Sequence, residues 1–298
     1  MSEQAHAHGG ANSWTIDEWF VVALARTIRN GEAVFHGFAS PCAQVAMHVA
    51  KRTHARDMLL IEGATYAVNP EPAFIPPTSN DLALHRGAAY RMRFEEFFDA
   101  ATRGAIDRMF LSGGQIDAWG STNVTAIGGM AGPGAGAQVA EAQTAGARIK
   151  LGGGCNISAT VKRLTLWSTR HRSGRTLVPK LDFCTDIGHR TAAGTRAELG
   201  YRGLGPQMLV TELGIFGYDA DGHAELRAVF PDVTVEQVER ATGFELRVAL
   251  AHGALQPPGL AELAAVRTVD PLGVRRSEFA PAELERRFVH DHAGGCAC

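Results

Sequence analysis

The chain has 298 residues, 45% of them hydrophobic and 20% charged, which is typical of a globular protein that buries one large core or two smaller ones. Its formal net charge of -2 comes from interspersed charges of both signs, which excludes the basic surface of proteins that bind nucleic acid or anionic membranes. Five scattered cysteines argue against a disulfide framework. Because residues 1–14 lack a signal-peptide pattern and no apolar stretch approaches the roughly 20 residues that span a bilayer, we expect a cytoplasmic location.

The first predicted element is a helix that begins after Thr15. Residues 15–18 have the spacing of a capping box, and apolar residues then recur on one helical face until residues 30–31 end the helix. A short strand is predicted over residues 33–38. Pro41 suits the first turn of a second helix, which ends near the basic residues 51–52.

A buried strand over residues 58–61 follows and leads directly to Glu62 and Gly63. A carboxylate that ends a buried strand is costly unless it is hydrogen-bonded or used in chemistry. Glu62 is therefore a candidate catalytic residue. The alternative is a structural one, in which Glu62 caps a neighbouring amide or pairs with an arginine.

Further along the chain, helical and strand patterns alternate. After a proline-rich loop at 70–77, a helix is predicted over 94–105, and strands are predicted at 109–111, 163–168 and 207–212. This alternation predicts an α/β fold with an open, mostly parallel sheet flanked by helices. We expect one domain over residues 15–275, between flexible tails at 1–14 and 276–298.

Two glycine clusters lie between these strands. The glycines of 128–136 lack the preceding strand and following helix of a dinucleotide-binding loop, so they predict an ordinary loop. Gly152, Gly153 and Gly154 are consecutive, and their unobstructed N–H groups suit stabilisation of an oxyanion. A tight turn between two strands is the structural alternative.

Two further groups of residues are weaker candidates. The terminal cysteines 296 and 298, with histidines nearby, lack the paired spacing of a structural zinc site, so no metal site is predicted. The basic run 170–175 is either a solvated turn or a contact for phosphate groups.

Taken in order, several motifs resemble the β subunit of family I CoA-transferases, with the glutaconate CoA-transferase type most similar. The resemblance covers roughly residues 15–275. The motifs stand at residue 62 and at residues 113–123, 152–156, 205–215, 231–238 and 242–244.

This resemblance implies the CoA-transferase fold, which sugar-phosphate isomerases share, and a homologous α subunit supplied by another chain, in an α2β2 assembly. It implies that Glu62 attacks an acyl-CoA thioester and that a glutamyl-CoA thioester then passes CoA to a second acid. Gly152, Gly153 and Gly154 would bind the oxyanion, and Gln115 and Asn123 would orient the acyl group. The coenzyme A thioester is a substrate, and no cofactor is expected.

The residues around Glu62 leave another interpretation open. The family's glutamate is followed by one residue and then glycine, whereas Gly63 follows Glu62 directly, so an ungapped alignment puts Gly63 at the catalytic position. A shift by one residue reverses the face on which a strand side chain emerges. Relatives without the nucleophile resemble a ring-opening hydrolase of steroid catabolism or a decarboxylase acting on a glutaconyl-CoA. A second alternative is a non-catalytic ligand-binding domain of the same fold.

Overall fold

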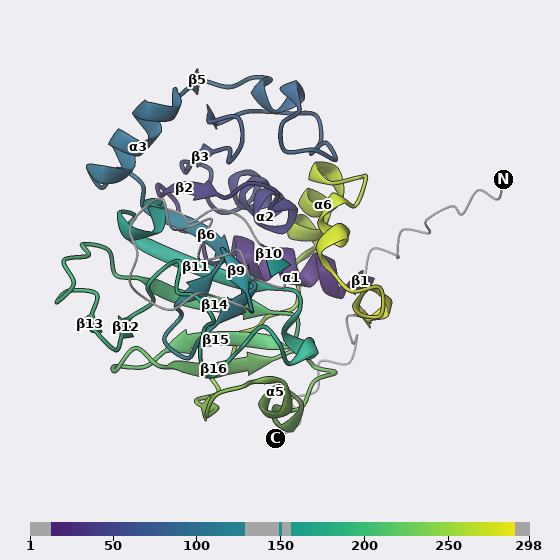
Figure 1. Cartoon of the computed structure of the whole chain (residues 1–298). Coiled ribbons are helices and arrows are strands. Elements are labelled where there is room, and N and C mark those ends of the chain that lie inside the picture. The colour runs from purple at the N-terminus through teal and green to yellow at the C-terminus, as the bar shows by residue number, and fades with distance from the viewer. Residues whose placement is uncertain (1–12, 129–148, 151–155, 290–298) are drawn as a thin grey trace.

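A ten-stranded sheet forms the centre of the molecule (Figure 1), with the strand order β17-β16-β15-β14-β11-β6-β2-β3-β4-β5. The structure is a computed structural model and describes residues 13–128, 149–150 and 156–289. Five neighbouring strands run parallel, β3, β2, β6, β11 and β14, and further strands, most of them paired antiparallel, extend the sheet at both edges. This confirms the predicted open, mostly parallel sheet.

The strands of this sheet have the following bounds. The parallel strands are β2 (Ala33–His36), β3 (Leu59–Ile61), β6 (Arg108–Ser112), β11 (Arg163–Ser168) and β14 (Pro206–Thr211). The edge strands are β4 (Ala67–Val68), β5 (Tyr90–Arg91), β15 (Gly214–Tyr218), β16 (Ala224–Val229) and β17 (Arg247–Val248). Two-residue strands form small separate pairs: β7 (Gln115–Ile116) with β8 (Thr122–Asn123), β9 (Ala126–Ile127) with β10 (Ile149–Lys150), and β12 (Arg190–Thr191) with β13 (Gly194–Thr195).

The helices are α1 (Ile16–Ala25), α2 (Pro41–Arg52), α3 (Phe94–Thr102), α5 (Val235–Ala241) and α6 (Leu260–Val269). Of these, α1, α2 and α6 pack together as one layer beside the sheet (Figure 1). The predicted capping box is present, since the Thr15 amide donates to Glu18 Oε2 at 3.0 Å. The predicted helix end at residues 30–31 is wrong, because α1 stops at Ala25 and a turn follows.

The two faces of the sheet bury different side chains. In β2, Phe35 packs against Phe97 of α3, with ring centroids 4.3 Å apart, whereas the next residue, His36, is directed to the layer that contains α2. Side chains alternate between the faces of a strand, so these two neighbours belong to opposite layers. Because of this alternation, the Phe35 side chain and the His36 side chain have different surroundings.

The described fold includes residues on both sides of the range 15–275. Strand β1 (Ser13–Thr15) pairs antiparallel with β18 (Arg287–Val289), which joins the two ends of the domain. Between α6 and β18, two 3-10 turns, η4 (Val274–Glu278) and η5 (Glu283–Glu285), pack onto the domain, and Phe279 is buried in the core. Residues 276–289 are therefore part of the fold, while the histidines and cysteines of 290–298 lie outside the described residues.

Among the described residues, the helices are too short or too polar to cross a lipid bilayer.

Candidate active site

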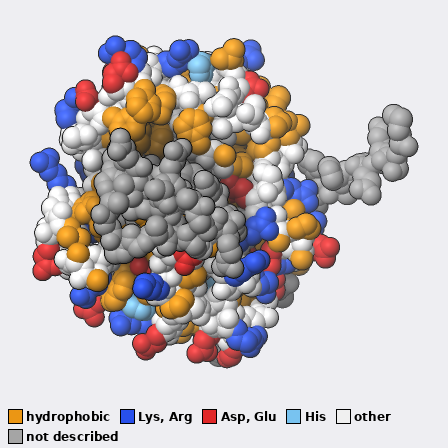
Figure 2. Space-filling view, in the orientation of Figure 1, with side chains coloured by type: hydrophobic (Ala, Val, Ile, Leu, Met, Phe, Trp, Pro, Cys, Tyr) orange, Lys and Arg blue, Asp and Glu red, His pale blue; other side chains and the backbone are white. Residues whose placement is uncertain are grey.

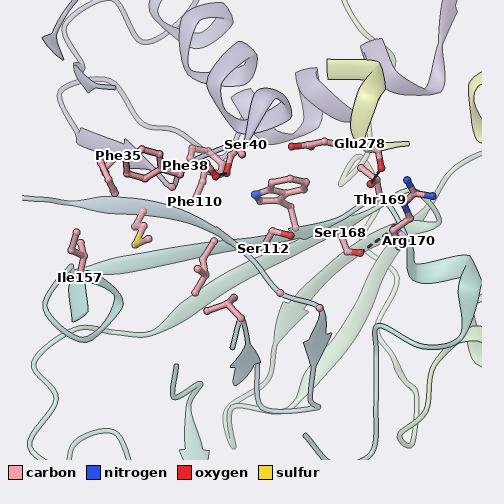
Figure 3. Close-up of a pocket in the computed structure, with 18 of the residues that line it drawn as sticks. Phe35, Phe38, Ser40, Phe110, Ser112, Ile157, Ser168, Thr169, Arg170 and Glu278 are labelled. Carbon is pink, nitrogen blue, oxygen red and sulfur yellow. Dashed lines mark hydrogen bonds between the residues drawn. The ribbon is translucent and has the colours of Figure 1, made fainter. Parts of the chain in front are cut away.

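A cavity of about 810 Å³ opens at the carboxyl ends of the parallel strands β2, β6 and β11. Ligands of open α/β sheets bind at this edge, because loops and polar groups converge where parallel strands end. Figure 3 shows the lining residues projecting from these strands and from η4. The residues that line the cavity come from the ends of these strands, from α3 and from the loops beside them, and they include Phe35, Gly37, Phe38, Ser40, Tyr66, Phe94, Phe98, Met109, Phe110, Ser112, Gly113, Gly114, Val124, Ile157, Trp167, Ser168, Thr169, Arg170, Thr176 and Glu278.

One end of the cavity is apolar. It is lined by aromatic side chains from β2, α3 and β6 and by Met109 and Ile157, and Figure 3 shows Phe35, Phe38 and Ile157 together at this end. Phe38 and Phe94 are 58% and 60% exposed, which is high for aromatic residues. Figure 2 shows hydrophobic side chains gathered on this side of the molecule, where Figure 1 has α3 and β3. This end of the cavity is suited to the hydrocarbon part of a ligand.

The other end of the cavity is polar. Ser112 is the last residue of β6, and Ser168 is the last residue of β11. Thr169 and Arg170 follow Ser168 directly and also line the cavity. The Arg170 amide donates to Ser168 Oγ at 3.1 Å, which fixes the start of this loop. Arg170 is exposed and lines the cavity, so of the basic run 170–175 it is the residue placed to meet an anionic group.

Glu278 is the carboxylic acid that lines this polar end. Burial raises the pKa of the Glu278 carboxyl to about 8, and hydrogen bonding from Cys42 offsets only part of that rise. The carboxyl group is therefore mostly neutral at pH 7. Sequence reasoning missed this residue because it lies in the segment expected to be a tail.

The raised pKa of Glu278 predicts a pH-dependent stability. The unfolded carboxyl loses its proton near pH 4.5 and the folded one near pH 8, so the native state holds one proton more between these values. The free energy of unfolding should then fall by up to about 1.4 kcal/mol per pH unit in this range because of this group. Urea titrations at pH 5.5, 6.5 and 7.5 should show a shallower decline for Glu278→Gln. Equal slopes for both proteins would contradict the prediction.

Glu62 does not line the cavity. Its side chain is fully buried against α2, where Oε1 lies 2.7 Å from His48 Nε2, and Oε2 accepts from Gln44 Nε2 at 2.8 Å and lies 3.0 Å from His36 Nε2. Of the two directions that the sequence left open for this side chain, the structure shows the one that faces α2 and not the cavity. Gln44 and His48 of α2 and His36 at the end of β2 supply its partners, so the side chain faces the α2 layer.

The surroundings of Glu62 also control its charge. Burial by itself raises the pKa of the Glu62 carboxyl, but hydrogen bonds from His36 and His48 outweigh burial and hold that pKa far below its ordinary value. A carboxylate whose lone pairs are occupied in this way is a weak nucleophile in this conformation. Its role as nucleophile stays a prediction.

Gly63 occupies the position that the ungapped alignment makes catalytic. A Cβ atom added there would lie 2.4 Å from the His36 carbonyl oxygen and 2.8 Å from that of Gly37, which lines the cavity. A side chain at residue 63 would therefore overlap the backbone at the end of β2, which leaves no room for one. Glycine at 63 allows the end of β3 to approach β2 closely.

Gln115 and Asn123, the predicted acyl-orienting residues, pair with each other across the hairpin of β7 and β8. Asn123 Nδ2 donates to Gln115 Oε1 at 2.9 Å and to the Ala126 carbonyl at 2.7 Å. Both side chains are buried and do not line the cavity, although their neighbours Gly113, Gly114 and Val124 do. They hold the loop that forms one wall. Gly152, Gly153 and Gly154 lie outside the described residues.

Comparison with known proteins places this geometry among acyl-CoA enzymes. No protein-family model matches the chain. The chain is 30% identical to the B subunit of 3-oxoadipate CoA-transferase from Pseudomonas knackmussii over 264 residues, covering 87% of this chain and 94% of that protein. It is 30% identical over 268 residues, with the same coverages, to the B subunit of glutaconate CoA-transferase from Acidaminococcus fermentans.

Solved structures agree with these relatives. The crystal structure of the A. fermentans glutaconate coenzyme A-transferase superposes with a TM-score of 0.68 at 26% identity, covering 90% of this chain and 98% of that one. The decarboxylase AibA/AibB superposes with a TM-score of 0.71 at 29% identity, covering 89% of this chain and 98% of that one. One backbone thus carries at least two kinds of chemistry among the chain's relatives.

Proposed function

Because the chain belongs to the family of CoA-transferase B subunits, we propose that its cavity binds the acyl part of a CoA thioester during transfer of CoA to a carboxylic acid. The observation that carries this proposal is the cavity at the carboxyl ends of β2, β6 and β11, apolar at one end and polar at the other. The apolar end suits the acyl chain. The polar end suits the oxygen atoms of a thioester or carboxylate.

A partner chain is part of this proposal. The relatives are B subunits, so an A-type subunit is expected, in a cytoplasmic assembly of two copies of each chain. Three large apolar side chains between β4 and α3 support a covered surface, since Phe74, Leu82 and Tyr90 are 43%, 77% and 54% exposed. Large apolar side chains left exposed in one segment favour contact with another protein.

Transfer through Glu62 sets a structural condition. The carboxylate has to leave His36, Gln44 and His48 and turn from α2 toward the cavity before it can form a bond to the thioester carbonyl carbon. CoA would then leave as the thiolate and return to attack the resulting anhydride. In this proposal the conformation in which Glu62 faces α2 is a resting state of the enzyme, and the reacting conformation differs from it.

A second candidate function follows from the same residues. Glu62 is directed to α2 and residue 63 has no side chain, so the described conformation presents no carboxylate from β3 to the cavity. This favours carbon–carbon bond cleavage of an acyl-CoA without a glutamyl intermediate, by a decarboxylase or a ring-opening hydrolase. The structural similarity to the decarboxylase AibA/AibB supports this alternative.

Substitution of Glu62 distinguishes the two functions. In the complex of the full chain with its A-type subunit, Glu62→Gln should lower CoA transfer from acetyl-CoA to glutaconate or 3-oxoadipate by about 10³-fold or more. His48→Gln is the matched control, because it removes a partner from the same network and leaves the carboxylate. It should keep most of the activity.

Borohydride reduction during turnover supplies an independent test. A glutamyl thioester at Glu62 would be reduced to an alcohol, which peptide mass spectrometry would locate at residue 62. CoA transfer that survives in Glu62→Gln would contradict the role of Glu62 as nucleophile. The same holds if Glu62→Gln and His48→Gln lose activity equally and in proportion to their loss of stability. Cleavage of an acyl-CoA in place of transfer would support the second function.

A further inference from the structure

Glu278 is held at the polar end of the cavity by contacts between distant parts of the chain. It is the last residue of η4, and its carbonyl accepts a hydrogen bond from Thr169 Oγ1 at 2.6 Å, just beyond the end of β11. Figure 3 shows Glu278, Thr169 and Arg170 side by side at one end of the cavity. The backbone of Glu278 is therefore fixed relative to the strand ends.

The half-buried Glu278 forms no ion pair among the described residues, which it shares with the buried acids Glu212 and Asp186 but not with Glu32, Asp270 and Glu62. Glu32 is paired with Arg108 at 2.8 Å, Asp270 with Arg275 at 2.8 Å, and Glu62 with two histidines. Glu278 Oε2 is buried and has no hydrogen-bond partner among the described residues. A buried carboxyl oxygen without a partner is unfavourable, and a bound ligand can supply the missing hydrogen bond.

Cys42 hydrogen-bonds the Glu278 carboxyl group, but among the described residues Oε2 still has no partner. Cys42, at the start of α2, is a neutral thiol whose pKa burial raises well above its ordinary value. Arg275, in the same turn, is paired with Asp17 and Asp270. Arg170 lines the cavity from the loop after β11. Glu278 therefore meets its surroundings as a neutral acid whose O–H can donate.

The neighbouring polar groups of the cavity can donate hydrogen bonds as well. Trp167 Nε1 is buried and has no hydrogen-bond partner in the described part of the chain, and an indole N–H can only donate. Ser112, Ser168 and Thr176 contribute hydroxyl groups, and Arg170 contributes a guanidinium. A lining rich in donors fits a ligand group that accepts, such as a carbonyl or a carboxylate.

From this arrangement we propose that Glu278, as a neutral carboxylic acid, donates a hydrogen bond to an acyl oxygen of the ligand and thereby positions the acyl group at the polar end of the cavity. The oxygen belongs either to the thioester carbonyl or to the free carboxylate of the acceptor acid. This inference rests on the proposed function, since it assigns the acyl group to this cavity. Glu278 acts here as a positioning residue, and no bond to it forms or breaks.

The test compares Glu278→Gln, which keeps a donor, with Glu278→Leu, which removes it, in the complex with the A-type subunit. The probes are glutaconate for the free acid and acetyl-CoA for the thioester, with dissociation constants measured by calorimetry between pH 6.5 and 9. Glu278→Leu should bind the affected probe about tenfold more weakly at pH 7. Glu278→Gln should stay within about threefold of the wild type.

The pH profile separates a donating acid from a merely structural side chain. Wild-type binding should weaken about tenfold between pH 7 and pH 9, as the carboxyl with a pKa of about 8 loses its proton. Glu278→Gln should show no such weakening, because an amide does not titrate. A pH effect on glutaconate alone assigns the bond to the free acid, and an effect on acetyl-CoA alone assigns it to the thioester.

Two results would overturn the inference. One is Glu278→Leu binding both probes as the wild type does, and the other is Glu278→Gln binding as weakly as Glu278→Leu; either outcome removes the role of the donor. If neither probe binds the wild-type complex, the proposed function fails together with the inference. Binding that is insensitive to residue 278 refutes the inference alone.

Discussion

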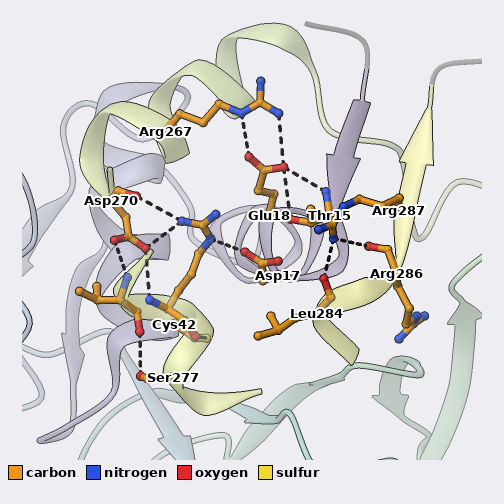
Figure 4. A network of polar contacts seen from close by, with 12 residues as sticks. Thr15, Asp17, Glu18, Cys42, Arg267, Asp270, Ser277, Leu284, Arg286 and Arg287 are labelled. Atoms are coloured by element: carbon orange, nitrogen blue, oxygen red, sulfur yellow. Dashed lines mark hydrogen bonds and ion pairs between the residues drawn. The ribbon is translucent and has the colours of Figure 1, made fainter. Parts of the chain in front are cut away.

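An Arg275→Met variant should lose about 3–5 kcal/mol of its free energy of unfolding, because two buried carboxylates would lose their shared cation. Arg275 is buried, with Nε 2.9 Å from Asp17 Oδ2 and Nη1 2.8 Å from Asp270 Oδ2. These contacts join the start of α1, the end of α6 and η4, as Figure 4 shows. Methionine has similar length and no charge, so the effect measures the unpaired acids.

Arg267→Met is the control within the same network. Arg267 Nε contacts Glu18 Oε1 at 2.7 Å, but the arginine side chain is 23% exposed, so water replaces much of the lost interaction. We expect a loss of only about 1 kcal/mol for this variant. Guanidinium denaturation of the two variants at pH 7 provides the comparison. Equal losses would show that burial of the Arg275 cluster does not set its contribution.

The Arg275→Met variant should also weaken ligand binding. Glu278 is three residues further along η4, and the ion pairs of Arg275 fix that turn against α1 and α6. Loosening of η4 would displace Glu278 from the polar end of the cavity. Weaker binding of glutaconate to Arg275→Met than to Arg267→Met would support this connection, whereas equal binding would contradict it.

A Gly63→Ala variant should be destabilised by about 2–3 kcal/mol, because the added methyl group overlaps backbone atoms that cannot turn aside. Its Cβ would lie 2.4 Å and 2.8 Å from the carbonyl oxygens of His36 and Gly37. Relief of this overlap requires β3 and the end of β2 to separate. The loop that starts at Gly37 lines the cavity, so binding of the acyl probes should weaken as well.

Gly37→Ala is the matched control for this variant. A Cβ at Gly37 would meet only Ser40 Oγ, at 3.8 Å, which is an ordinary contact. Its free energy of unfolding should stay within about 0.5 kcal/mol of the wild type. Urea titration of both variants tests the pair. A Gly63→Ala variant as stable as Gly37→Ala would show that the end of β3 has more freedom than the structure indicates.

Local patterns of the sequence determined most of the sheet and its helices. The capping box at Thr15 and Glu18 forms because both partners lie within one helical turn, so no distant residue is needed. The strands predicted near 58–61, 109–111, 163–168 and 207–212 are present as β3, β6, β11 and β14, because apolar runs between helices bury only in such a sheet. The family could be recognised as well, because its motifs are short runs of sequence, such as residues 205–215 around β14 and residues 231–238 at the start of α5.

Two of the polar residues that line the cavity could also be predicted from these strands. Ser112 and Ser168 each end an apolar strand, and parallel strands bring their carboxyl ends to one edge. A polar residue at the end of an apolar strand, which is the pattern that singled out Glu62, therefore also marks Ser112 and Ser168 as candidates for the site. The same pattern does not predict that Trp167 and Phe35 line the cavity, because the direction of their side chains depends on which face of the sheet each helix covers.

The direction of Glu62 and the role of Glu278 were decided only by the tertiary structure. Glu62 turns to α2 because Gln44 and His48, 18 and 14 residues earlier in the chain, offer hydrogen bonds on that face of β3. Glu278 reaches the cavity because Thr169, 109 residues earlier, holds its backbone at the end of β11. Residue spacing carries periodicity and local hydrogen bonds, but the environment of a carboxyl group depends on which distant elements enclose it, and folding alone brings these together.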